Sequence, residues 1–115
     1  MPSHYVNGKW IAGEGPRLTA YDPSTGACTW SGSAATAAEV DAACKAARAS
    51  FDAWAMRASD ERIGVCNRFR DLLKEHAEDL ARLIALEVGK PLWEARTEVA
   101  SMAGKIDISV QAYRA

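Results

Sequence analysis

The chain has 115 residues, which is the size of one ordinary domain and excludes a self-contained multidomain enzyme. Apolar residues make up 49% and charged residues 25%, as in soluble globular proteins. The formal net charge of −1 argues against nucleic-acid partners, because proteins that bind nucleic acids are usually clearly basic. No stretch approaches the roughly 20 apolar residues of a membrane-spanning helix, so no membrane partner is expected.

Residues 1–32 predict two β-hairpins. Asn7 and Gly8 lie between short apolar runs and predict the turn of the first hairpin, because both residues tolerate positive φ. Residues 17–21 and 27–31 predict the strands of the second, joined at 22–26 by a turn that contains proline and glycine. Hairpins this short are not stable alone, so they need a neighbouring element to pack against.

Residues 33–115 predict helices. Thr36 followed by Glu39 forms a capping-box pattern that predicts the start of the first helix. Apolar residues then recur at three- and four-residue spacing, which places them on one stripe of the helix, and the stripe ends before a break near Arg57. The stripe consists of Val40, Ala43, Ala47, Phe51 and Trp54.

A second apolar stripe runs from about Ser59 to Val88. Ser59 is the predicted N-cap, and a kink is expected near His76, because the run is long for one helix. Gly89 predicts the end of this run. Pro91 predicts the first residue of a third helix, where the missing N–H costs nothing, and this helix continues to the end of the sequence.

Few residues suggest chemistry. The cysteines are odd in number and widely spaced, which predicts reduced thiols in the cytoplasm and no zinc or redox motif: Cys28, Cys44 and Cys66. His4 and His76 are far apart and match no metal-binding pattern, so a small metal or redox protein is disfavoured. A nucleophilic pair of His76 and Cys66 is disfavoured as well, because a cysteine on an apolar stripe is usually a buried hydrophobe.

The order of several short motifs resembles the start of the aldehyde dehydrogenase superfamily. These motifs are Asn7-Gly8-x-Trp10, Asp22-Pro23-x-Thr25-Gly26, Phe51-x-x-Trp54 and Glu87-Val88-Gly89-Lys90-Pro91. The continuation from Leu92 through Glu98, Met102 and Lys105 looks closest to the branch that oxidises N-succinylglutamate 5-semialdehyde to N-succinylglutamate in arginine catabolism. The resemblance covers almost the whole chain.

The resemblance implies that residues 1–115 form the amino-terminal segment of an enzyme about four times as long. The full-length enzyme would use NAD or NADP, and this segment would belong to its α/β, Rossmann-like cofactor-binding domain. A cysteine thiolate attacks the aldehyde in this family, hydride passes to the nicotinamide, and a glutamate activates water. None of the cysteines or glutamates here matches those motifs, so no catalytic, cofactor-binding or metal residue is assigned, and no cofactor is expected for the segment alone.

Met102 is the single candidate site residue, because the matching position lines the substrate tunnel in the family. Its helical spacing is equally consistent with a plain core position. By itself the segment should be inactive and mainly α-helical, with hairpins at residues 1–32 and helices at 33–115. Its expected partners are the remainder of the dehydrogenase chain and further copies of itself. The alternative is a free-standing helical interaction domain without catalysis, because uncovered apolar stripes favour association.

Overall fold

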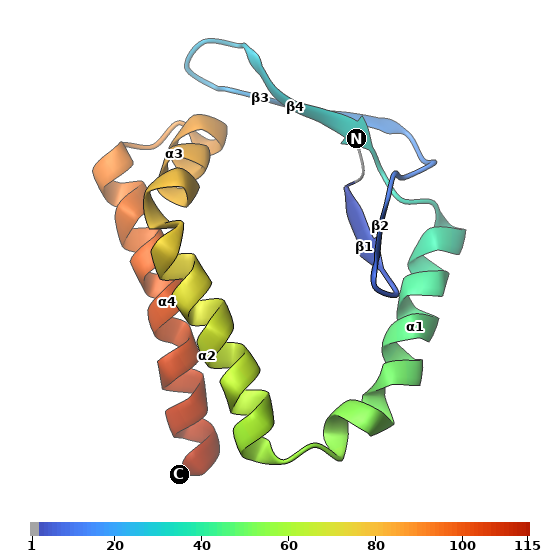
Figure 1. Ribbon diagram of the computed structural model, residues 1–115. Helices are drawn as coiled ribbons and strands as arrows, with labels where there is room; N and C mark the ends of the chain where they lie inside the picture. Colours follow the sequence, from blue (N-terminus) through green and yellow to red (C-terminus); the bar gives the residue numbers. More distant parts are fainter. Residues whose placement is uncertain (1–2) are drawn as a thin grey trace. The chain divides into compact units, whose positions relative to one another are not determined.

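The computed structural model describes residues 3–115, which contain four short strands and four helices (Figure 1). The expected mainly helical fold with amino-terminal hairpins is confirmed. The chain divides into two compact units. The first unit combines residues 3–21 with Ala27–Met56, and the second combines Asp22–Gly26 with Arg57–Ala115. Along residues 3–115 no helix combines the length and the apolar character that a bilayer crossing requires.

The first hairpin pairs β1 (His4–Val6) with β2 (Lys9–Ile11) in antiparallel register. Asn7 and Gly8 take φ values of 49° and 79° at its turn, which confirms the predicted reversal. Tyr5 and Trp10 face each other across the two strands, with ring centroids 5.3 Å apart. Such an aromatic pair helps to fix the register of a hairpin that is otherwise too short to be stable.

The second hairpin pairs β3 (Arg17–Tyr21) with β4 (Cys28–Ser33). The first strand has its predicted bounds, whereas the second begins one residue later and ends two residues later than expected. A register shift between Ala20 and Tyr21 leaves Thr29 of β4 without a partner strand residue, so that Cys28 pairs with Tyr21. The ladder then extends to the pair of Arg17 and Ser33.

The first helix, α1 (Ala37–Ala55), begins at the predicted capping box. The Thr36 hydroxyl accepts from the Glu39 backbone N–H, and Oε2 of Glu39 accepts from the Thr36 backbone N–H at 2.7 Å. These bonds satisfy amide groups that a helix start otherwise leaves unpaired. The predicted stripe is not buried, since no residue of α1 is buried in the described structure.

Three helices form the second unit: α2 (Ser59–Glu75), α3 (Ala77–Val88) and α4 (Leu92–Arg114). The N-cap prediction was wrong by one residue, because Ala58 takes the extended conformation and its carbonyl accepts the first helical bond, from the Arg62 N–H. Ser59 therefore lies inside the first turn. The break expected near His76 is confirmed, and it separates α2 from α3.

Gly89 ends α3 with a φ of 74°, and its N–H donates to the carbonyl of Ala85, as expected for a glycine stop. A side chain at Gly89 would place a Cβ 2.6 Å from Cγ of Pro23, so the glycine also allows the loop at residues 22–26 to approach closely. Pro91 was expected to be the first helical residue, but it is the N-cap. Its ψ of 140° is extended, and its carbonyl accepts from the N–H groups of Glu94 and Ala95.

The core of this unit lies where α4 packs against α2 and α3 (Figure 1). Its buried residues are small, so the helix backbones approach closely. They are Ala81, Ala95, Val99 and Ala103. Leu80, Ile84 and Leu92 are partly buried against this cluster. Most large apolar side chains of the unit stay outside the core, among them Phe69 and Met102.

Candidate functional site

An apolar groove of about 490 Å³ follows the seam between α2 and α4. Both helices contribute residues at three- and four-residue spacing, which brings them to one face of each helix. The α2 wall consists of Cys66, Phe69 and Leu73, and the α4 wall of Met102, Lys105, Ile106, Ser109 and Val110. A concave, largely apolar surface with few polar groups has the general character of a small-molecule site.

Met102 lies in the wall of this groove and is 40% exposed. It is therefore not part of the buried cluster, which uses the neighbouring face of α4 at Val99 and Ala103. Cys66 lines the same groove and is exposed, so the expectation of a buried cysteine was wrong. Its stripe passes from the helix seam into the open groove, and no described element covers it there.

Two polar side chains interrupt the apolar lining. Lys105 and Ser109 are four residues apart on α4, so they occupy one face one turn apart. Within residues 3–115 the Lys105 ammonium has no ion pair, and the Ser109 hydroxyl has no hydrogen bond to another protein group. The nearby carboxylate of Asp107 is already bound to Arg70 at 2.6 Å.

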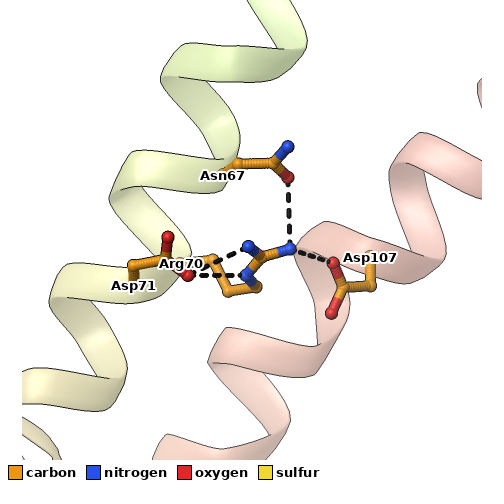
Figure 2. A network of polar contacts seen from close by, with 4 residues as sticks. All are labelled: Asn67, Arg70, Asp71 and Asp107. Atoms are coloured by element: carbon orange, nitrogen blue, oxygen red, sulfur yellow. Dashed lines mark hydrogen bonds and ion pairs between the residues drawn. The ribbon is translucent and has the colours of Figure 1, made fainter.

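Arg70 links the two helices that form the groove (Figure 2). Its guanidinium donates from α2 to Asp107 on α4, and also to Asn67 at 3.2 Å and to Asp71 on its own helix. The hydrogen bond to Asp107 first, and then that to Asp71, raise the pKa of Arg70 above its ordinary value. Only 22% of the Arg70 side chain is exposed, so this bridge is better shielded from solvent than most surface ion pairs.

A second bridge holds α4 to α3. Nε and Nη2 of Arg96 each donate at 2.9 Å to the carboxylate of Glu78, in the paired geometry that suits an arginine and a carboxylate. Hydrogen bonding by Arg96 lowers the pKa of Glu78 below its ordinary value. Lys90, between α3 and α4, pairs with Glu98 and Glu94, and the bond to Glu98 is the main cause of the raised pKa of Lys90.

The titratable residues considered for catalysis do not come together. His4 lies in the first unit, where its Nε2 is 3.1 Å from the Ser33 carbonyl oxygen. His76 caps the end of α2, ten residues beyond Cys66, and no contact joins them. The three cysteines are free thiols. Within residues 3–115 no three histidine, cysteine or acidic side chains gather as metal ligands.

The described residues do not fit a dinucleotide site either. Such a site needs a strand that leads through a glycine-rich turn into a helix, so that backbone N–H groups face the pyrophosphate. Both sheets here are antiparallel hairpins, and β4 reaches α1 through Ala34, Ala35 and Thr36, without glycine. No cofactor-binding residue is assigned in residues 3–115.

Comparison with known proteins decides the family. The sequence model of the aldehyde dehydrogenase family matches residues 10–115. The chain belongs to the aldehyde dehydrogenase family. Curated relatives include an N-succinylglutamate 5-semialdehyde dehydrogenase of Ectopseudomonas mendocina, 51% identical over 114 residues, and one of Chromobacterium violaceum, 53% identical over 112 residues. They align with 99% and 97% of this chain, which spans only 23% of either relative.

Solved aldehyde dehydrogenases have the same arrangement of elements. The structure superposes on a NAD-dependent benzaldehyde dehydrogenase from Corynebacterium glutamicum with a TM-score of 0.89 and 27% identity, covering 92% of this chain and 24% of that one. It superposes on a NADP-dependent glyceraldehyde-3-phosphate dehydrogenase from Bacillus halodurans with a TM-score of 0.82 and 32% identity, covering 86% and 21%. This family segment is therefore built from the hairpins and helices described above.

Sequence reasoning singled out one groove residue as a site candidate and placed the apolar ones only on helix stripes. Met102 came from the resemblance, whereas Lys105 and Ser109 were not assigned to a site and the Arg70–Asp107 bridge was not predicted. The sequence could have indicated Lys105 and Ser109 as groove residues, because both lie within one helical turn of the apolar stripe of α4. The bridge has no comparable signal, since its partners are 37 residues apart.

Proposed function

We propose that this chain is the amino-terminal segment of an NAD(P)-dependent dehydrogenase that oxidises N-succinylglutamate 5-semialdehyde to N-succinylglutamate in arginine catabolism. The main support for this proposal is sequence similarity: about half of the residues, over nearly the whole chain, are identical to those of enzymes with that name. The fold supports the same assignment, because the neighbours include NAD- and NADP-dependent dehydrogenases. The catalytic cysteine, the glutamate and the dinucleotide-binding turn come from the remainder of the protein, in which this segment joins a Rossmann-like domain.

The direct test is aldehyde-dependent reduction of NAD and of NADP by the full-length protein. N-succinylglutamate 5-semialdehyde should be oxidised with a higher kcat/KM than succinate semialdehyde or hexanal. The 115-residue chain alone should give no turnover, because its cysteines have neither a catalytic base nor a cofactor site beside them. A full-length enzyme that prefers hexanal would contradict the substrate assignment, and thiol-dependent turnover by the short chain would contradict its inactivity.

Met102 is proposed to line the substrate channel of the complete enzyme. Its place in the groove, half-exposed and beside Ile106, supports this role. Met102→Ala would widen the channel, so KM for the preferred aldehyde should rise about 10-fold, the lower end of the effect of losing one methylene contact in an apolar pocket, because Met102 is half-exposed. Met56→Ala is a suitable control, because Met56 is 86% exposed and belongs to the other unit.

The proposed partner of the segment is the remainder of the dehydrogenase chain, and in its absence a second copy. The exposed apolar side chains support this proposal, since α1 alone exposes Val40, Phe51 and Trp54. Sedimentation equilibrium of the short chain should show concentration-dependent dimers or larger species. A strictly monomeric chain that binds no hydrophobic dye would contradict self-association. The free thiols agree with a cytoplasmic location, where cysteines are kept reduced.

A further inference from the structure

The groove between α2 and α4 combines an apolar lining with one cation. Among the described residues that line it, Lys105 is the only charged one. The other polar lining residue, Ser109, lies one helical turn further along the same face. An ammonium and a hydroxyl at this spacing can both donate to one carboxylate, and charged acceptors form the stronger hydrogen bonds.

Both donors are available to a ligand. No carboxylate within residues 3–115 pairs with Lys105, although the chain contains 15 acidic residues, and Asp107 is held by Arg70 instead. Lys45 and Lys90 form ion pairs with acidic residues on their own or the following helix, whereas Lys9 and Lys74, like Lys105, form none within residues 3–115. Lys105 differs from the other four lysines in lining the apolar groove between α2 and α4.

The proposed substrate has the matching chemistry. N-succinylglutamate 5-semialdehyde carries a carboxylate on its succinyl group and another on its α-carbon, joined by an aliphatic and amide backbone. Such a molecule needs a cation for at least one carboxylate and apolar contacts along its chain. Because a buried carboxylate without a partner is costly, the cation determines which aldehydes bind well.

We propose that Lys105, assisted by Ser109, binds a carboxylate of the anionic aldehyde substrate and makes the enzyme selective for carboxylated over uncharged aldehydes. This inference rests on the proposed function. It assigns to the segment a determinant of specificity that lies apart from the reacting aldehyde carbon. In this proposal the methylene stem of Lys105 contributes to the apolar lining, and its ammonium meets the carboxylate beside Ser109.

The test compares Lys105→Met, Lys105→Arg and Ser109→Ala in the full-length enzyme on two aldehydes. For N-succinylglutamate 5-semialdehyde, Lys105→Met should lower kcat/KM about 10- to 100-fold, mainly through KM, as expected for one lost charge-assisted hydrogen bond. For hexanal the same variant should keep the wild-type value. Lys105→Arg should retain most of the selectivity, and Ser109→Ala should lower it by a smaller factor.

Lys45→Met is the matched control. Lys45 forms an exposed i,i+4 ion pair with Asp41 on α1, and its side chain is 77% exposed. Its removal should leave the ratio of the two kcat/KM values unchanged. Circular dichroism of each variant verifies folding. An equal loss of kcat/KM for both aldehydes in Lys105→Met would overturn the proposal, and so would wild-type kcat/KM values for both.

Calorimetric titration with N-succinylglutamate, the carboxylated product, provides a readout without turnover. Its Kd should weaken by a similar factor in Lys105→Met and remain unchanged in Lys45→Met. If the wild-type enzyme oxidises neither aldehyde, the proposed function fails, and the titration still decides the carboxylate site. An unchanged Kd in Lys105→Met would exclude Lys105 as a carboxylate ligand even if oxidation of the aldehyde is confirmed.

Discussion

The two units of the chain use apolar residues in opposite ways. In the first, α1 carries a regular apolar stripe, yet none of its residues is buried. In the second, α4 buries Ala95, Val99 and Ala103 against its neighbours and adds charged bridges to both. Hydrophobic periodicity is therefore the same kind of signal in both helices, but it identifies a core only where a second helix is present to complete it.

The largest expected effect on stability comes from a buried charge introduced into the second unit. Val99 is 1% exposed, so Val99→Asp places a carboxylate among the buried apolar residues between packed helices. We expect it to reduce the free energy of unfolding by about 3 kcal/mol or more, with a loss of helical signal in thermal denaturation followed by circular dichroism.

Val40→Asp gives the same chemical change on α1. Val40 is 52% exposed, so at dilutions where the chain is monomeric its substitution should shift the free energy of unfolding by at most about 0.5 kcal/mol. Equal destabilisation by the two variants would show that the stripe of α1 is covered in solution, and the contrast between the units would disappear.

Substitutions at two glycines of the second unit should have effects of intermediate size on the free energy of unfolding. Gly89 has a φ of 74°, and a Cβ there would crowd Pro23. Gly89→Ala should therefore cost about 1–2 kcal/mol in urea denaturation. Gly64 lies within α2 with open space around it, so Gly64→Ala should stabilise the chain by about 0.5–1 kcal/mol. If Gly89→Ala and Gly64→Ala destabilised the chain by similar amounts, neither the positive φ of Gly89 nor its proximity to Pro23 would explain the effect of Gly89→Ala.

The smallest expected effect is the pH dependence of the bridge between α3 and α4. The hydrogen bonds from Arg96 hold the pKa of Glu78 below its ordinary value of 4.5. The folded state thus binds a proton less readily than the unfolded state, so the bridge stabilises folding above pH 4.5 and loses this effect as pH falls through the lowered value.

The comparison of wild type with Glu78→Gln measures that contribution. Wild type should be the more stable at neutral pH, and the difference should shrink in acid and in high salt, because Glu78 is partly exposed. A difference that stays constant from neutral to acidic pH would assign the stability to packing of the side chain and not to its charge.

The parts of the fold that the sequence predicted depend on local backbone chemistry. The turn at Asn7–Gly8, the capping box of Thr36 and Glu39 and the stop at Gly89 each follow from residues a few positions apart. The errors at Ser59 and Pro91 were single-residue shifts, because several neighbouring residues suit a helix start and backbone angles select among them.

The candidate site depended on contacts between distant residues. Arg70 and Asp107 meet only because α2 and α4 pack side by side, and neither residue reveals its partner by spacing. Cys66 looked buried because its stripe is apolar, but exposure depends on how far the facing helix extends across that stripe. The family resemblance indicated Met102, whereas the electrostatic character of the groove required the placement of Lys105 and Ser109 along it.

The short connection at residues 89–91 has a consequence for how the protein is made. It folds α4 directly back along α3, so the two helices pair residues that are close in the sequence. Contacts of low sequence separation form quickly, and chains fold from the amino terminus as they leave the ribosome. The pairing of α3 with α4 can therefore form early, before contacts between residues that are more distant in the sequence.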